Sequence, residues 1–386
     1  MRTLATVGVF AAVWIAPMAL ADQPLADWPE LDQRFQKAVD DADYLSLSVA
    51  IVHEDEIVYA KGFGMADTEH DRQATPDTLY RIGSLTKLFT ALLMAQLRDE
   101  GRLKLDDAIG DTLGADFKLP THPLGAPTIT WRHLATHTSG LPRVPTNLLP
   151  KFGDPYNNYS AEQLRDMLAN TQLEHPIGAV YSYSNLGFGL LGFCLERLTG
   201  EPYEQMLQTR ILRPLGMRDT CVKIPASAAA RAARSYIDHN GDVPAEDWEL
   251  GVLGPAGALA STANDLARFA IWQLKAGRSE TDVVRTGTLA ETQRPQVMAP
   301  DWSVGVGLAW HSGNVPNLGF VLSHNGGIAS YFSHISLAPD RRVGVVILTN
   351  SGHDANEIGI WTLRQAIERF SSAPQRESET HAESQP

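Results

Sequence analysis

Cysteine is almost absent from this sequence, which has only Cys194 and Cys221 in 386 residues. A small scaffold held together by several disulfides is therefore excluded. The two thiols are free to pair in an oxidising compartment, but nothing in the sequence requires it. Cys194 stands inside an apolar run, 187–195, where a buried free thiol is the commoner state, so we favour two unpaired cysteines.

Runs of positive charge are absent as well. The net charge is −13 and the pI is about 5.4, without a Lys/Arg-rich segment. A nucleic-acid partner or an anionic membrane surface is therefore not expected. The sequence also has no Gly-x-Ser-x-Gly elbow and no phosphate-binding glycine loop, which argues against an α/β-hydrolase and against a nucleotide cofactor. We expect no cofactor.

Long apolar runs occur only at the start of the chain. Arg2, an apolar stretch over 4–16 and the small-x-small sequence Ala19-Leu20-Ala21 are typical of a secretory signal peptide, 1–21, cleaved after Ala21. No later run is long enough to cross a bilayer, so the mature chain is predicted to be secreted or periplasmic, without a membrane span. The other end, 372–386, is rich in Ser, Glu and Gln and is predicted to be a disordered tail.

Strand-like runs are present near both ends of the chain and helical patterns lie between them. Alternating or β-branched runs occupy 45–53, 57–64, 304–310, 319–324, 331–337 and 343–349. Amphipathic patterns over 27–44 and 355–370 predict a helix at each end. We therefore predict an α+β fold. Residues 22–83 and 250–371 form one discontinuous domain, an antiparallel sheet flanked by the terminal helices, and 84–249 form a mostly helical inserted domain.

Ser84-Leu85-Thr86-Lys87 is the first chemically suggestive motif. Residues three apart lie on one helix face, so the Ser84 hydroxyl and the Lys87 amine are neighbours. An amine with a lowered pKa activates a serine for nucleophilic attack, and a helix start favours that lowering. The four residues alone also fit a capped helix with a solvated lysine, which is the commoner situation.

Two further motifs follow in order. Tyr183-Ser184-Asn185 offers a phenol that passes protons and a carboxamide that holds a substrate amide, although Asn185 alone also suits a helix cap. His324-Asn325-Gly326-Gly327 lies between two predicted strands, where glycines leave room for a ligand and a free backbone N–H can face an oxyanion. Taken alone, it is equally compatible with a glycine turn.

In this order, the three motifs make the chain similar to the serine β-lactamase and penicillin-binding family. It resembles the branch that contains class C β-lactamases, D-Ala-D-Ala carboxypeptidases and related esterases. The resemblance covers roughly residues 31–370 and includes the β-lactamase/transpeptidase-like fold. The phrases that carry it are Tyr80-Arg81-Ile82-Gly83-Ser84-Leu85-Thr86-Lys87, His137-Thr138-Ser139-Gly140-Leu141-Pro142, Tyr183-Ser184-Asn185, Gly254-Pro255-Ala256-Gly257 and His324-Asn325-Gly326-Gly327.

The resemblance implies a role for each matching residue. Ser84 would be the nucleophile that forms an acyl-enzyme, and Lys87 and Tyr183 would move its proton, with the division of labour between them left open. Asn185 would bind the substrate amide. The backbone N–H groups of Ser84 and Gly327 would form the oxyanion hole, with Gly326 beside them.

One position departs from the pattern of many relatives, which have Lys-Thr-Gly where this chain has His324-Asn325-Gly326. A lysine is charged at pH 7, whereas an ordinary histidine is mostly neutral and attracts a substrate carboxylate weakly and in a pH-dependent way. We therefore expect D-amino-acid peptides, amides or esters as acyl donors rather than a specialised β-lactamase activity. The alternative is a catalytically silent protein that only binds peptidoglycan fragments or penicillins.

Partners and metals complete the expectations. The substrate is expected to be a small molecule or a peptidoglycan-derived peptide, and the protein a monomer. His133 and His137 are four residues apart, a spacing that suits zinc, but the glutamate of His-Glu-x-x-His is missing. We expect no metal site and assign both histidines a structural role.

Overall fold

The computed structural model describes residues 27–121, 128–279, 281, 283–351 and 353–372. The predicted signal peptide, 1–21, lies outside this range. Most of the predicted tail does as well, but its first residue, Ser372, ends the last helix, α10 (Asn356–Ser372). The helix therefore extends one residue into the segment assigned to the tail by composition.

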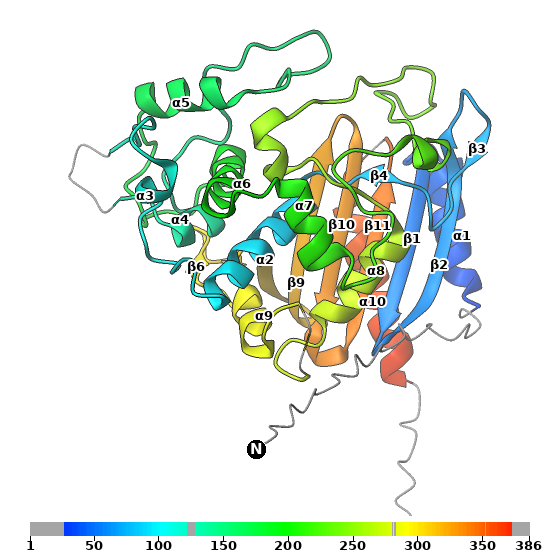
Figure 1. Ribbon diagram of the computed structural model, residues 1–386. Coiled ribbons are helices and arrows are strands. Elements are labelled where there is room, and N and C mark those ends of the chain that lie inside the picture. Colours follow the sequence, from blue (N-terminus) through cyan, green and yellow to red (C-terminus); the bar gives the residue numbers. More distant parts are fainter. Residues whose placement is uncertain (1–26, 122–127, 280, 282, 352, 373–386) are drawn as a thin grey trace, which may run out of the picture.

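A nine-stranded antiparallel sheet forms the centre of the molecule (Figure 1). Its strand order is β3-β2-β1-β11-β10-β9-β8-β7-β6, so that an early strand pairs with the last one. The strands are β1 (Ser46–His53), β2 (Glu56–Asp67), β3 (Arg72–Gln73), β6 (Val297–Met298), β7 (Gly305–Val306), β8 (His311–Val315), β9 (Gly319–Ile328), β10 (Tyr331–Ala338) and β11 (Val343–Thr349). A separate pair joins β4 (Tyr80–Arg81) to β5 (Ala260–Ser261).

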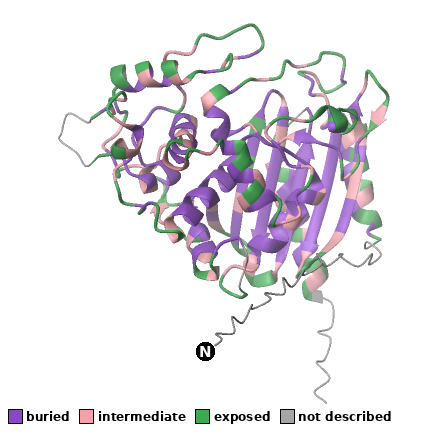
Figure 2. Cartoon of the chain, in the orientation of Figure 1, coloured by how far each residue is buried: buried purple, intermediate pink, exposed green. Residues whose placement is uncertain are grey.

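Both faces of the central strands are covered. In β11, Val345 and Ile347 pack with the terminal helices, whereas Val346 and Leu348 face the larger core on the opposite side. This alternation follows from the two-residue period of a strand. It explains why β11 has no polar side chain before Thr349 and is buried along its whole length, and Figure 2 shows the resulting buried centre.

Helices cover the sheet and fill the middle of the chain. α1 and α10 lie on one face, while α8 packs on the other face against β1 and β11. The α-helices are α1 (Pro29–Asp40), α2 (Thr86–Asp99), α3 (Gly110–Leu113), α4 (Trp131–Ala135), α5 (Ala161–Asn170), α6 (Asn185–Thr199), α7 (Tyr203–Leu207), α8 (Ala263–Gln273), α9 (Thr286–Gln293) and α10. The predicted α+β, β-lactamase/transpeptidase-like architecture is confirmed.

Local capping signals decide where several helices begin. Ser160 caps α5 and forms a capping box with Gln163, and Thr262 caps α8 by accepting from Asp265 N. At α6 the cap is Ser184, whose hydroxyl accepts from Gly187 N. Asn185 is therefore the first helical residue and its side chain is free for another role.

The last third of the sheet differs in detail from the pattern in the sequence. The apolar run 304–310 contributes only β7, and the next strand, β8, is His311–Val315. The sequence of β8, His-Ser-Gly-Asn-Val, is poor in β-formers, so its strand conformation comes from pairing with β9 along the whole segment. The strand places His311 opposite Ser323, beside the predicted site.

Candidate active site

Ser84 lies where the chain passes from the sheet into the helices. It is the middle residue of a 3₁₀ turn, Gly83–Leu85, that continues directly into α2. Gly83 has a φ of +51°, and a Cβ there would be 2.8 Å from Gly327 N. A side chain at position 83 is excluded on both counts. The glycine thus allows β9 to lie against the residue before the candidate nucleophile.

Lys87 is completely buried next to Ser84. Its Nζ lies 2.9 Å from Ser84 Oγ, 2.9 Å from Asn185 Oδ1 and 2.6 Å from the backbone oxygen of Ala256. Burial, and to a lesser degree the positive charge of Arg143, lower the pKa of Lys87 well below its usual 10.5. A neutral amine in this position is able to take the proton of the Ser84 hydroxyl.

Tyr183 packs against Lys87 from the loop before α6. Its ring centroid is 4.9 Å from Lys87 Nζ and 5.0 Å from Arg143 Cζ, and the ring stacks on His137 at 4.3 Å. Burial raises the pKa of Tyr183, an effect that the contact with the Ser84 hydroxyl partly offsets. The phenol is therefore protonated near neutral pH and is able to donate to a leaving group or relay a proton.

The glycines of β9 bring a strand edge against Ser84. A Cβ at Gly326 would be 2.1 Å from Ile82 O and 2.9 Å from Ser84 N, so only glycine fits there. β9 and β10 are joined by a two-residue turn, with Ile328 opposite Tyr331 and Gly327 opposite Phe332. The pair that closes such a turn is hydrogen-bonded and the next pair is not.

Gly327 N–H consequently points away from β10. Since Gly327 N also lies beside Gly83, its N–H and that of Ser84 are placed at one edge of the candidate site. Two backbone N–H groups at such an edge are the donors that an oxyanion needs. The six positions predicted around Ser84 come from three places that meet here: the start of α2, the end of β9, and the start of α6 with the loop before it. They are Lys87, Tyr183, Asn185, His324, Gly326 and Gly327.

His324 is 2% exposed, and its Nδ1 lies 2.7 Å from Asn325 O. Its Nε2 has no hydrogen-bond partner among the described residues. Burial is the main cause that lowers its pKa well below 6.5, and nearby His311 and Lys87 add to the effect. At pH 6–7, His324 therefore attracts a substrate carboxylate more weakly than a histidine with the ordinary pKa would.

Two site residues were not foreseen from the sequence. Arg143 follows the His137-to-Pro142 phrase directly; its exposed guanidinium lies over Tyr183, and its backbone oxygen accepts from Asn185 N. His311 lies 5.1 Å from the His324 ring, and its Nε2 is 2.8 Å from Tyr181 Oη. Burial lowers the pKa of His311 to about 4. Of these two residues, only Arg143 could have been suspected from the sequence, because it directly follows the His137-to-Pro142 phrase.

The structure also shows what His133 and His137, the two histidines with a spacing that suits zinc, contact. His133 closes the capping box of α4 with Thr130, and His137 packs on Tyr183 with its Nδ1 accepting from Ser184 N. No group of three or more potential metal ligands occurs in the part of the chain that the structure describes.

Cys194 and Cys221 are both buried, free thiols. None of the helices described combines the length and apolar character needed to cross a bilayer.

An antiparallel sheet with terminal helices on one face, a helical insertion, and a Ser-x-x-Lys serine beside a tyrosine together define the class: a protein of the β-lactamase/transpeptidase-like fold with a Ser-x-x-Lys site. Within that class, the chain belongs to the Beta-lactamase family, whose model matches residues 31–368.

Curated relatives agree with this membership. The D-alanyl-D-alanine-carboxypeptidase/endopeptidase AmpH of Escherichia coli K12 is 30% identical over 287 residues, which cover 71% of this chain and 72% of that protein. Penicillin-binding protein 4 of Amycolatopsis lactamdurans is 29% identical, with 81% and 79% covered. Beta-lactamase-like protein 2 of Dictyostelium discoideum is 30% identical, with 83% and 58% covered. The chain spans just under three fifths of the length of several such relatives.

Solved structures share the fold. The octameric penicillin-binding protein homologue from Pyrococcus abyssi superimposes with a TM-score of 0.75 at 27% identity, covering 89% of this chain and 78% of that one. A class C β-lactamase from Rhodobacter sphaeroides gives a TM-score of 0.74 at 24% identity, covering 87% and 99%. The second likeness is evidence for the fold alone.

Proposed function

We propose that this protein is an exported hydrolase that forms an acyl-enzyme on Ser84, with D-amino-acid peptides or amides and esters as its acyl donors. The observation that carries the proposal is the buried Lys87 amine, 2.9 Å from Ser84 Oγ and with a lowered pKa. A serine beside a neutral amine is an activated nucleophile, whereas a serine beside an ammonium is not.

The proposed acylation begins when Ser84 Oγ attacks the substrate carbonyl and its proton passes to Lys87 or Tyr183. The oxyanion that forms accepts hydrogen bonds from Ser84 N–H and Gly327 N–H. The bond to the leaving nitrogen or oxygen then breaks, and the leaving group takes up the proton. Water then attacks the resulting ester and gives a proton to the same pair of side chains. The bond between the acyl carbon and Ser84 Oγ breaks, Ser84 Oγ takes up that proton, and the acid is released.

The choice of acyl donors rests on the charge around the site. His324 stands where many relatives have a lysine, and burial lowers its pKa further, so it carries little positive charge at pH 7. Donors that do not depend on a strongly held carboxylate are favoured. A relative named as a D-alanyl-D-alanine carboxypeptidase supports the peptide branch of this proposal.

Acyl-enzyme formation is tested by incubating the protein with a fluorescent penicillin and with 4-nitrophenyl acetate, followed by intact-mass and peptide-mass analysis. We expect an adduct on Ser84 and a loss of at least about 10³-fold in kcat in Ser84→Ala. Ser182→Ala is the matched control, because Ser182 lies beside Tyr183 but outside the proposed chemistry. A folded wild-type protein that forms no adduct with any donor would support the silent binding protein instead.

The substrate class is tested by measuring kcat/KM for D-Ala-D-Ala peptides, D-amino-acid amides, simple esters and β-lactams. We expect ester or D-peptide hydrolysis to exceed β-lactam turnover. Dominant cephalosporin turnover would contradict this. Export is proposed from the pattern over 1–21, and an exported chain whose mass still includes these residues would contradict cleavage after Ala21.

A further inference from the structure

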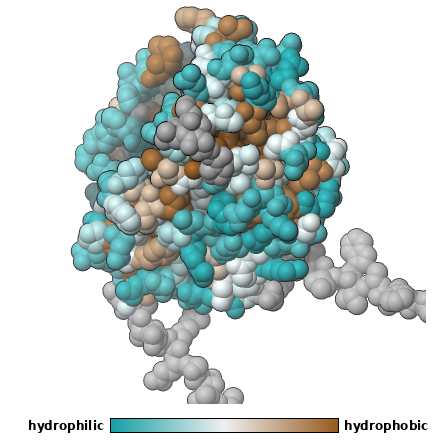
Figure 3. All heavy atoms as spheres, turned by 90° about the vertical axis from the view of Figure 1, so that its left-hand side faces the viewer, coloured by the Kyte–Doolittle hydropathy of each residue, from teal (hydrophilic) through white to brown (hydrophobic). Residues whose placement is uncertain are grey.

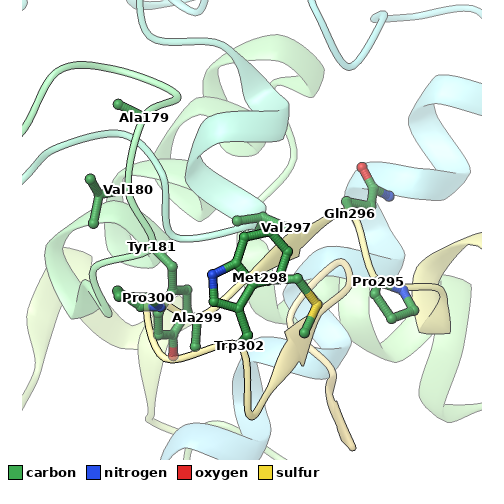
Figure 4. A pocket seen from close by; sticks show the side chains of 10 residues that line it. All are labelled: Ala179, Val180, Tyr181, Pro295, Gln296, Val297, Met298, Ala299, Pro300 and Trp302. Atoms are coloured by element: carbon green, nitrogen blue, oxygen red, sulfur yellow. The ribbon is translucent and has the colours of Figure 1, made fainter.

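A pocket of about 430 Å³ lies beside the candidate active site, between the loop that leads to Tyr183 and the segment around β6 (Figure 4). We call it the side pocket. Its lining residues are Ala179, Val180, Tyr181, Pro295, Gln296, Val297, Met298, Ala299, Pro300 and Trp302. The volume is in the range of small-molecule sites, which is about 300–1,000 Å³.

The chemistry of this lining is apolar. None of the ten residues is charged, and the side-chain oxygens of its two most polar members already have partners. Tyr181 Oη pairs with His311 Nε2, and Gln296 Oε1 accepts from Arg132. A charged ligand would find no counter-charge in the lining and would lose its hydration on entry.

The rim of the side pocket presents large apolar side chains to solvent. Trp302 is 78% exposed and Met298 is 36% exposed. Trp302 has a φ of +62°, which is unusual for a bulky residue, and hydrogen bonds hold the turn, including Trp302 N to Ala299 O at 2.8 Å. The indole is thus held at the surface by a closed turn. Figure 3, which faces the helical side, shows hydrophobic areas set among hydrophilic ones.

The side pocket adjoins the proposed catalytic residues. Tyr181, which forms its inner wall, precedes Tyr183 by two residues, and both rings contact His137. On the other side, Tyr181 Oη bonds to His311, whose ring is 5.1 Å from His324 and 6.4 Å from Tyr183. One layer of rings therefore separates this wall from the residues around Ser84.

The space directly at Ser84 is much smaller. The cavity there has a volume of about 30 Å³ and is bounded by residues that include Tyr156, Trp248 and Leu250. This volume exceeds the roughly 10–15 Å³ that one water molecule needs, so the cavity has room for a reacting group, and a longer substituent extends beyond it. A larger group on the acyl donor needs space elsewhere.

We infer that the side pocket is a subsite for an uncharged, apolar group of the acyl donor, such as a medium-length alkyl chain or an aryl ring. The inference rests on the proposed acyl transfer at Ser84 and adds the substrate class to it. Burying one methylene multiplies affinity by up to about fourfold, so two of the four extra methylenes of a hexanoyl group suffice for a tenfold preference over acetyl.

The first test compares kcat/KM for 4-nitrophenyl hexanoate and 4-nitrophenyl acetate. We expect a hexanoate-to-acetate ratio of at least about ten in the wild type. The ratio should fall about tenfold in Val180→Asp and several-fold in Trp302→Ala. Ile237→Ala, a change at another exposed apolar residue (69% exposed), serves as the control and should keep the wild-type ratio. Equal ratios in all four proteins would overturn the inference.

The second test measures binding without turnover. Calorimetric titration of Ser84→Ala with N-hexanoyl-D-alanine and N-acetyl-D-alanine should show at least about tenfold tighter binding of the hexanoyl compound. This preference should be lost in Ser84→Ala/Val180→Asp, with thermal unfolding used to check that the double variant is folded. Equal affinities for the two compounds would overturn the subsite, even if the wild type hydrolyses esters.

These readouts separate the two proposals. Absence of any adduct on Ser84 would disprove the proposed function, while the binding preference would still decide whether the side pocket takes apolar groups. A wild-type dimer that becomes a monomer in Trp302→Ala, with unchanged chain-length preference, would identify the pocket as a contact between copies of the chain and overturn the subsite.

Discussion

The Lys87 amine is surrounded by groups that favour its neutral form. It has no exposed surface, and its hydrogen-bond partners are uncharged oxygens of Ser84, Asn185 and Ala256. Burial lowers its pKa most, and the positive charge of Arg143 lowers it further. A buried ammonium is normally paired with a carboxylate, and none is among the contacts described for this amine.

The first residue-scale prediction concerns Arg143. Its positive charge disfavours protonation of Lys87, so Arg143→Gln should raise the pKa of Lys87. Activity that depends on the neutral amine should then be lost at a higher pH. In a plot of kcat/KM against pH, the acid limb (the fall in activity at low pH) should therefore move to higher pH. The measurement is a pH profile of kcat/KM with 4-nitrophenyl acetate, which carries no charge. On the acid side of the limb, kcat/KM of the variant relative to the wild type should fall roughly twofold or more.

The control is Arg165→Gln, which removes the same charge from the exposed surface of α5. It should leave the acid limb in place. An acid limb that stays unchanged in Arg143→Gln would show that the protonation controlling the rate is not that of Lys87. A lower rate at every pH, without movement of the limb, would instead indicate that Arg143 only positions Tyr183.

Among the elements, the hairpin of β9 and β10 has the most direct influence on the site. Its turn, Ala329-Ser330, has φ values of +46° and +64°. This conformation suits the right-handed twist of a hairpin, but it is normally formed by glycine or asparagine because a Cβ is strained there. The turn determines which residue pairs of β9 and β10 are hydrogen-bonded, and as a result Gly327 N–H points away from β10.

Replacing Ser330 by glycine should relieve part of this strain. We expect Ser330→Gly to stabilise the protein by about 0.5–1 kcal/mol, because the gain at positive φ exceeds the entropy cost of an added glycine. Thermal and urea unfolding would measure it. Gly319→Ala, at the other end of β9 with a φ of +83°, should change stability in the opposite sense. A destabilised Ser330→Gly would show that the turn is not strained.

The elements also show what a sequence reveals and what it does not. The starts of α5 and α8 were predictable because capping is local, and the approach of Ser84, Tyr183 and His324 was predictable because the three motifs have a known order. β8 was not, since its residues take strand conformation from β9. Arg143 over Tyr183 and the burial of His324 depend on packing between distant segments, which periodicity does not report.

At the scale of the whole molecule, buried histidines couple folding to pH. Burial lowers the pKa of His334 to about 4, and His137 and His324 are also lowered below 6.5. In the unfolded chain these rings bind protons near pH 6.5, whereas in the folded protein they do not. Their contribution to stability is complete above pH 6.5 and is lost as the pH falls toward the folded pKa.

We therefore expect the free energy of unfolding to decrease steadily between pH 6.5 and pH 4. His334 alone accounts for up to about 3 kcal/mol of this decrease. Urea unfolding at a series of pH values should show a shallower slope in His334→Gln than in the wild type. His239→Gln, at an exposed ring, should retain the full slope. If His334→Gln and the wild type have the same slope, the His334 ring binds protons as readily in the folded protein as in the unfolded chain, which would contradict the prediction.

The strand order has a consequence for how the protein matures. Ser48 lies opposite Leu348, so the middle of the sheet joins segments 300 residues apart. β11 also pairs with β10, whose other neighbour, β9, lies against Gly83, so this closure ties β9 and the residue before Ser84 into one sheet. A nascent chain interrupted before Val343 would carry Ser84, Lys87, Tyr183 and the β9–β10 hairpin, but not β11, the strand that joins this hairpin to β1. Loop closure over such a span is slow, so catalytic competence would arise late, after synthesis of nearly the whole chain.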